Sequence, residues 1–226
     1  MSRRGGTRVR PTRKPIVVVA GEDRNDRLSL RILLEEFCPE MRGRIVEIGD
    51  PVRLHQATGA NLAARAETLA RKVRARAVRD DTTVACVFVH EDLDAVDDDQ
   101  YPITRLRVEK ALEAALGTAH YALAVAEIES WLLLFPDALT AVSGSWWVPA
   151  RYRGRDTGRL TDPKQVLMKE VSGSSRRYRE ADAPEILGQV VAMGLAASPV
   201  GRNRSYEQLR EDAARCCSEH ISAKSR

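Results

Sequence analysis

Four short apolar runs, each followed by a segment with helical periodicity, constrain the fold of this chain most strongly. The runs are rich in Val, Ile and Ala and lie at 16–20, 44–48, 84–89 and 121–126. The helical patterns cover residues 25–37, 61–79, 103–116 and 127–134. Such runs are typical of strands buried on both faces. Their alternation with helices predicts an α/β fold, in which a parallel sheet of about four strands is flanked by helices through right-handed crossovers.

Composition divides the chain into three parts. Residues 1–14 carry six basic groups and no acid. They are expected to form a basic disordered arm, either a solvated tail or an arm that seeks phosphate groups. Residues 15–143 form the predicted α/β domain. Residues 144–226 begin with a loop-rich stretch and continue with helical patterns near 162–170, 184–195 and 205–220, so we expect a mostly helical C-terminal appendage packed on the sheet domain.

Charge and cysteine content limit the functional classes. The net charge is +4, and the arm supplies the excess, so the basic pI of 9.0 does not by itself indicate a nucleic-acid-binding protein. No apolar run reaches the ~18–20 residues that cross a bilayer, so no membrane partner is expected. The spacing of the four cysteines predicts neither a disulfide framework nor a zinc site, and Cys86 is expected in the core. A reducing, cytoplasmic location follows as the default.

Acidic residues follow every predicted strand. In chain order they are Glu22, Asp50, Asp92 with Asp94, and Glu127 with Glu129. Parallel strands bring their carboxyl ends to one edge of a sheet, where the functional crevice of such folds lies. Crowded carboxylates repel each other unless a cation lies between them, and Mg²⁺ prefers such oxygen ligands. In an extended segment Asp92 and Asp94 would point the same way and share one metal ion.

Other interpretations of nearby residues stay open. Asp97–Asp99 are expected in a solvated acidic loop. His90 is either a group behind the metal ligands or an ordinary histidine at a strand end. The sequence contains no EF-hand spacing, no GxxxxGK[ST] loop, no GxGxxG after the first strand and no GxSxG elbow.

Several of these segments resemble one protein family. The segments VVVAGEDRNDRLSLRILLEE, VFVHEDLDAVD and ALAVAEIESWLLLFPDAL resemble the Toprim-like family of small bacterial proteins called domain of unknown function 4276. AEIESWLL is the most specific of them. LMKEVSGSSRRYRE and SPVGRNRSYEQLR are similar to the C-terminal part of that family, so the resemblance covers residues 15–215 and leaves the arm outside.

The resemblance implies a Toprim-like sheet with Mg²⁺-dependent phosphodiester chemistry. Carried over, Glu22, Asp92 and Asp94 would be the acidic residues of that chemistry, and Glu127 and Glu129 match an acidic pair after the fourth strand. Toprim folds occur in OLD-type nucleases, and members of such families are often paired with ABC- or AAA-type ATPases, some in anti-phage defence. Nothing in the chain resembles a topoisomerase tyrosine domain or a primase zinc module, which favours hydrolysis.

The leading hypothesis is therefore a Mg²⁺-dependent nuclease, with Mn²⁺ as an alternative metal. Glu22, Asp92, Asp94 and Glu127 are its expected catalytic and metal-binding residues, and Glu129 is a further metal ligand. DNA or RNA would need basic side chains beside these acids. The candidates are Lys164, Lys169, Arg176, Arg177 and Arg179, together with Arg151, Arg153 and Arg155, and each is alternatively a solvated surface residue.

Two other functions compete with this hypothesis. The chain could be a non-catalytic or assembly-activated effector subunit of an ABC or AAA ATPase complex, which the lack of a P-loop motivates. It could also be a transferase whose DxD pair holds a nucleotide diphosphate. The transferase leaves Glu22 and Glu127 without a role.

Overall fold

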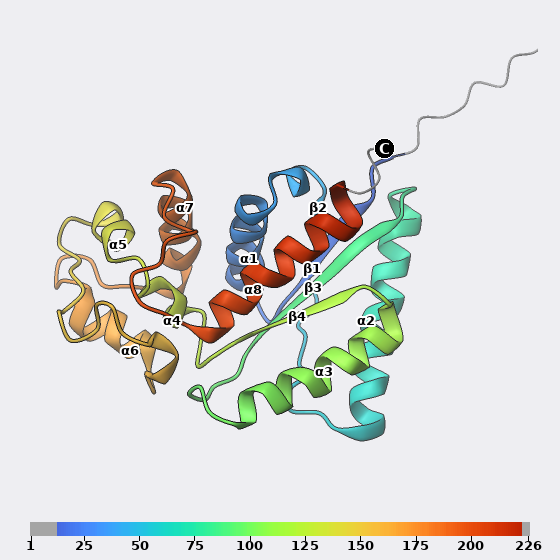
Figure 1. Cartoon of the computed structure of the whole chain (residues 1–226), viewed down its shortest axis with the longest axis horizontal. Coiled ribbons are helices and arrows are strands. Elements are labelled where there is room, and N and C mark those ends of the chain that lie inside the picture. Colours follow the sequence, from blue (N-terminus) through green and yellow to red (C-terminus); the bar gives the residue numbers. More distant parts are fainter. Residues whose placement is uncertain (1–12, 223–226) are drawn as a thin grey trace, which may run out of the picture.

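The computed structural model describes residues 13–222 and shows helices on both sides of a parallel sheet (Figure 1). The strands of the described part are β1 (Ile16–Ala20), β2 (Ile45–Ile48), β3 (Val84–Asp92) and β4 (Ala119–Ala124), in the order β2-β1-β3-β4. The helices are α1 (Arg24–Phe37), α2 (Gly59–Arg79), α3 (Gln100–Leu116), α4 (Glu129–Leu132), α5 (Pro136–Val142), α6 (Pro163–Val166), α7 (Ala183–Ala192) and α8 (Arg204–Cys216). All three strand pairings are parallel, so the predicted α/β architecture is confirmed.

The side chains of β1 alternate between two apolar clusters, one on each face of the sheet. Val17 and Val19 pack with residues of α1, α7 and α8, whereas Val18 and Ala20 pack with residues of α2 and α3. Because both faces are covered, every residue of β1 is buried. This explains the continuous apolar run at 16–20, which lacks the alternation of a strand with one solvated face.

The C-terminal residues complete one of these two layers. α8 lies against β4 and α1, and α7 packs on α1 and α5 (Figure 1). Tyr206 and Leu209 of α8 belong to the same buried cluster as Trp131. The described residues after 143 and the sheet therefore share one core.

The ends of several predicted elements differ from the structure, and three of the differences lie near the carboxyl ends of β3 and β4. β3 continues to Asp92 instead of ending at residue 89, because its last residues pair with β4 in a register that ends with Asp92 opposite Ala124. β4 lies at 119–124, two residues earlier than predicted. The helical pattern at 127–134 yields only α4, followed by a turn.

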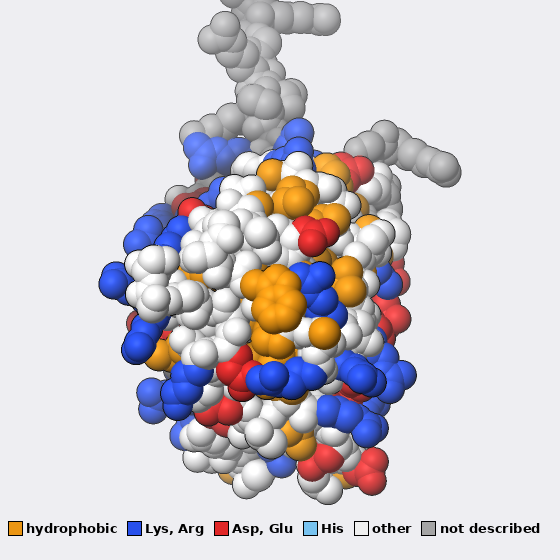
Figure 2. Space-filling model, turned by 90° about the vertical axis from the view of Figure 1, so that its left-hand side faces the viewer, with side chains coloured by type: hydrophobic (Ala, Val, Ile, Leu, Met, Phe, Trp, Pro, Cys, Tyr) orange, Lys and Arg blue, Asp and Glu red, His pale blue; other side chains and the backbone are white. Residues whose placement is uncertain are grey.

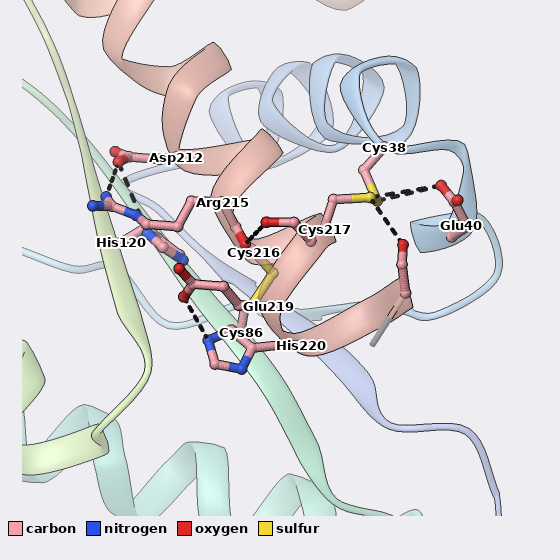
Figure 3. The surroundings of a disulfide bond; sticks show 12 residues. Cys38, Glu40, Cys86, His120, Asp212, Arg215, Cys216, Cys217, Glu219 and His220 are labelled. Carbon is pink, nitrogen blue, oxygen red and sulfur yellow. Dashed lines mark hydrogen bonds and ion pairs between the residues drawn. A yellow bond between two sulfur atoms is a disulfide. The ribbon is translucent and has the colours of Figure 1, made fainter. Parts of the chain in front are cut away.

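The four cysteines form two disulfide bonds, so the prediction from their spacing is wrong. Figure 3 shows adjacent Cys216 and Cys217 bonded to Cys86 and Cys38. The partners are 130 and 179 residues apart in sequence, while their Cα atoms lie 6.4 and 5.9 Å apart. Pairing of this kind depends on tertiary proximity, which spacing does not reveal. Cys86 is buried, as expected. The cytoplasmic location stays a prediction and loses the support it took from unpaired cysteines.

The predicted basic arm lies almost wholly outside the described residues. Of its residues only 13 and 14 are described, and Arg13 Nη1 donates a hydrogen bond of 2.6 Å to the carbonyl oxygen of Asp80. Within residues 13–222, no helix combines the length and the apolar composition that a membrane span requires.

Candidate metal centre

The strand order places a crevice between the carboxyl ends of β1 and β3. From β1 the chain proceeds to β2 on one side, and then to β3 on the other side of β1. In doubly wound sheets the ligand crevice lies at such a change of direction. Ala20, the last residue of β1, pairs with Val89 of β3. Glu22 follows β1 by two residues and Asp92 ends β3, so the topology brings these two acids to the crevice.

Glu22 and Asp92 line one cavity of about 260 Å³. Glu129, at the start of α4, lines it too, so three of the five predicted metal-binding residues meet there. The remaining lining residues are Asp23, Asn25, Asp26, Arg53, Ile128, Lys164, Glu180 and Ala183. The cavity is therefore bordered mainly by carboxylates, with two basic side chains among them.

Asp26 is a carboxylate of this cavity that was not predicted. It reaches the cavity through a capping box at the start of α1. The Asp23 side chain accepts a hydrogen bond of 2.9 Å from the Asp26 backbone N–H, and Asp26 Oδ2 accepts one of 3.2 Å from the Asp23 N–H. The spacing of two acids three residues apart before an apolar helix carries this signal in the sequence.

Burial and the repulsion between neighbouring acids raise the pKa values of Asp92 and Glu22. Burial raises the pKa of Asp92 well above its ordinary value, and the nearby charges of Asp26 and Glu129 raise it further. The pKa of Glu22 is raised by burial first and then by Glu91. Both shifts have one physical cause, since ionised carboxylates in a poorly hydrated site lose hydration and repel each other. A bound cation would reverse both effects.

Glu129 is the most deeply buried carboxylate of the cavity, at 3% exposure. Burial raises its pKa to about 7, although the charge of Lys164 opposes the rise. The hydroxyl of Tyr178 donates a hydrogen bond of 3.0 Å to Glu129 Oε1. Tyr178 is itself buried, so it packs into the C-terminal part and also fixes a carboxylate of the candidate site.

Glu127 is held by Lys164. The Lys164 Nζ atom lies 2.7 Å from Glu127 Oε2 and 3.1 Å from Glu180 Oε1. Burial alone would lower the pKa of Lys164, but the hydrogen bond with Glu127 and the charge of Glu129 raise it above its ordinary value. Lys164 thus stays charged and offsets part of the negative charge of the site. Among the predicted basic residues described, only Lys164 lines the cavity.

Asp94 does not extend the strand beside Asp92. β3 ends at Asp92, and Asp94 has a left-handed backbone conformation with φ of 57°. Ala126, on the adjoining loop after β4, is also left-handed with φ of 56°, and the Asp94 N–H donates to its carbonyl at 2.9 Å. The extended geometry that would give Asp92 and Asp94 a shared ion is therefore absent. Asp94 is exposed and lies near Glu22, whose pKa its charge raises.

The other acids after the strands do not join the cavity. Asp50 lies 3.1 Å from Lys72 Nζ and lines a separate cavity of about 440 Å³ beside α2. Asp98 and Asp99 are exposed, as expected for a solvated loop, and Asp98 Oδ1 accepts a hydrogen bond from the Gln100 N–H. Asp97 is half-buried and pairs with Arg204 at 3.5 Å.

The predicted nucleic-acid-binding residues other than Lys164 do not line this cavity. Arg176 pairs with Asp182 and Glu185 and donates to the carbonyl of Val142, so it fixes the fold. Lys169, Arg177 and Arg179 are exposed, as are Arg151, Arg153 and Arg155, of which Arg151 pairs with Glu170. The view of Figure 2 shows Lys and Arg side chains around a central group of hydrophobic ones. Trp147 is 57% exposed, whereas Trp131 and Trp146 are in the core.

His90 supplies an independent test of whether these residues suit a divalent cation. Its side chain is fully buried, and neither ring nitrogen has a hydrogen-bond partner among the described residues. Nε2 lies 3.7 Å from Asp92 Oδ1 and Nδ1 lies 4.0 Å from Asp26 Oδ2. A buried histidine with two ring nitrogens close to carboxylates but not hydrogen-bonded to them leaves orphaned polar atoms beside the cavity, as expected where an ion or water is the missing partner. The oxygen-rich lining and this histidine both fit Mg²⁺ or Mn²⁺.

A buried network holds the loop that carries Glu127 and Glu129. The Ser205 hydroxyl accepts hydrogen bonds from the Val125 N–H at 3.0 Å and from Trp131 Nε1 at 2.8 Å. Asn203, the N-cap of α8, donates to the Ser130 hydroxyl at 3.0 Å. The segment 203–205 therefore fixes both ends of the turn around residues 127–129. The sequence did not reveal this role of the C-terminal part.

His55 and Glu91 also lie beside Glu22 without having been predicted. One ring nitrogen of His55 and one oxygen each of Glu22 and Glu91 lie within 4.8 Å of one another. His55 follows β2 by seven residues, beyond Asp50, so a search of the residues directly after each strand does not reach it.

Comparisons of the chain with protein-family models, with curated proteins and with solved structures found no match.

Proposed function

We propose that this chain is a divalent-metal-dependent nuclease, which hydrolyses phosphodiester bonds of DNA or RNA. One observation supports this most. Glu22 and Asp92 line the same cavity, which lies between the carboxyl ends of β1 and β3, where the strand order reverses, and Glu129 and Asp26 line it too. Burial, with the crowding of carboxylates at this cavity, raises the pKa values of Glu22, Asp92 and Glu129, a cost that a cation removes. The proposal also agrees with the resemblance to Toprim-like proteins.

The residues of the site would have different roles in this chemistry. Glu22, Asp92 and Glu129 would hold a Mg²⁺ or Mn²⁺ ion, with Glu127 close by. A bound ion would polarise a phosphate oxygen and lower the pKa of a water molecule. In the alternative role, Glu22, which is half-buried, would orient the attacking water and take up its proton. Lys164, charged and at the cavity wall, would attract the phosphate group.

The proposal is tested by incubating the purified chain with plasmid, single-stranded DNA and RNA, with Mg²⁺, with Mn²⁺ or with EDTA. Cleavage should require the metal. Glu22→Gln and Asp92→Asn should each lower the rate by roughly 10–100-fold or more, because each removes a metal-binding oxygen. Asp50→Asn is the matched control, since Asp50 also follows a strand but lines a different cavity.

Three outcomes separate the proposal from its competitors. Metal-dependent cleavage that both substitutions abolish and the Asp50 control keeps supports it. Cleavage that is unaffected by Glu22→Gln and Asp92→Asn contradicts the assignment of the site. Inactivity of the chain alone, with metal-dependent cleavage appearing on addition of an ATPase, would make it the effector subunit of a complex.

A further inference from the structure

Trp147 exposes a large aromatic ring on a part of the chain that is otherwise firmly held. It is 57% exposed, whereas its neighbours Trp146 and Val148 are in the core. The Trp147 N–H donates a hydrogen bond of 3.0 Å to the carbonyl oxygen of Val171. Trp146 Nε1 donates one of 2.7 Å to the carbonyl oxygen of Arg176. Two other segments therefore hold the backbone under the ring, while the ring itself stays accessible to a partner.

The guanidinium group of Arg153 lies against this ring. Its Cζ atom is 5.8 Å from the centroid of the Trp147 ring, within the range of a cation–π contact. The Arg153 Nε–H donates a hydrogen bond of 3.0 Å to the carbonyl oxygen of Val148, which holds the guanidinium group beside the ring. The indole therefore has a positive charge next to it, while more than half of the surface of Trp147 stays open.

The segment around this ring concentrates positive charge. Residues 144–179 contain nine Lys or Arg and three Asp or Glu, a net charge of +6 in a chain whose total is +4. Arg153, Lys169 and Arg177 are exposed, and none of them has an ion-pair partner in the described part of the chain. Figure 2 views the side of the molecule with α5 and α6 and shows Lys and Arg side chains beside exposed hydrophobic ones. Such a surface complements the phosphate groups of a nucleic acid.

One helical segment connects this surface with the metal cavity. α6 continues into a π-helical turn at Leu167–Val171, so residues 163–171 form one helical stretch. Lys164, near its start, lines the cavity, and Val171, at its end, accepts the hydrogen bond from Trp147. The helical rise between these two residues is roughly 10 Å. A strand bound at Trp147 therefore lies a short way from the proposed metal centre.

We propose that Trp147 and Arg153 form a stacking platform for an unpaired base of single-stranded DNA or RNA. A base stacks on an exposed aromatic ring, and an arginine beside the ring adds a cation–π contribution and a charge for phosphate groups. A base inside a duplex is already paired and stacked, so its faces are closed to the indole. The inference rests on the proposed nuclease function and narrows its substrate to single strands or single-stranded parts of a duplex.

The platform is tested by binding in EDTA, where a metal-dependent nuclease cannot cleave the ligand. Trp147 is the exposed one of the three tryptophans, since Trp131 and Trp146 are in the core. Oligo(dT) should therefore quench the tryptophan emission of the wild-type chain, and a duplex oligonucleotide should quench it far less. Trp147→Ala should lose the quenching and bind labelled oligo(dT) roughly 5–100-fold more weakly by fluorescence anisotropy. Trp147→Phe should recover part of that affinity, because it keeps an aromatic face.

A second variant tests the charge, and a third is the control. Arg153→Ala should weaken binding and reduce the slope of log affinity against log salt by roughly 0.7, the loss expected for one phosphate contact to a single strand. Ile103→Ala is matched in exposure, since Ile103 is 56% exposed, but it lies on α3, which covers the other face of the sheet. It should bind oligo(dT) as the wild type does.

The outcomes keep this inference apart from the proposed function. Equal affinity of Trp147→Ala and the wild type, or equal quenching by duplex and single strand, would refute the platform and leave the metal-dependent cleavage to its own assay. Binding to vesicles that contain phosphatidylserine, without binding to oligo(dT), would overturn the platform in favour of a lipid surface. Single-strand binding through Trp147 by a chain that no metal ion makes active would support the platform and contradict the proposed function.

Discussion

Replacing Glu129 with glutamine removes a buried ionisable group whose charged form destabilises the folded chain. The pKa of Glu129 is about 7 in the folded protein, against an ordinary value of 4.5, because the carboxylate is buried. Folding therefore favours its protonated form. The stability that goes with protonation is fully present below pH 4.5 and is lost as the pH rises through about 7. Glutamine stays neutral at every pH and keeps an oxygen that accepts from Tyr178.

The size of the effect follows from the difference between the two pKa values. A gap of this size corresponds to about 3 kcal/mol in the free energy of unfolding at high pH. For a chain of this length, about 3 kcal/mol shifts the Tm by roughly 6–12 °C. With EDTA present, Glu129→Gln should melt higher than the wild type at pH 8, and the two Tm values should converge towards pH 4.5.

Thermal unfolding followed by circular dichroism at several pH values measures this difference. Glu207→Gln, on the exposed side of α8, is the matched control and should show no pH-dependent gain. A Tm difference between Glu129→Gln and the wild type that stays constant from pH 4.5 to pH 8 would refute the reasoning.

Three further predictions concern the site and its supports. Without metal, Asp92→Asn should raise the Tm at neutral pH, because the repulsion among the cavity acids is relieved, and an unchanged or lower Tm in EDTA would count against their crowding. Ser205→Ala should destabilise the chain by roughly 1–3 kcal/mol in urea unfolding, since it leaves the buried Trp131 Nε1–H without its acceptor; a loss below this range would show that another group replaces the hydroxyl. Reducing the two disulfides should lower the free energy of unfolding by about 2–4 kcal/mol for each bond, and melting curves that coincide with and without a thiol reductant would argue against bonded cysteines.

The parallel sheet could be predicted because its strands are buried on both faces. Because helices cover both faces of the sheet, every residue of β1 is apolar. A continuous apolar run of this kind can be recognised from the sequence alone. The boundaries of β3 and β4 were harder to predict, because they depend on the pairing between the two strands. His90 and Glu91 carry polar side chains yet belong to the strand, because this pairing extends to Asp92.

The carboxylates of the cavity were predictable where a residue lies at or just after the end of a strand, as for Asp92 and Glu22. His55 lies farther along its loop, and only the contact with Glu91 brings it back to the sheet edge. The role of the C-terminal part was also invisible, because Ser205 meets the turn after β4 from 80 residues away in sequence. Asp50 shows the opposite case, since it follows a strand and faces a different cavity.

The central claim is that acids from separate parts of the chain share a divalent ion. Crystals of the protein grown with MnCl₂ and measured at a wavelength where manganese scatters anomalously test it most directly. The account predicts an anomalous peak in the cavity between Glu22 and Asp92, within about 2.5 Å of their carboxylate oxygens. Ordered Glu22 and Asp92 side chains at saturating Mn²⁺ without such a peak, or a peak only elsewhere on the chain, would contradict it.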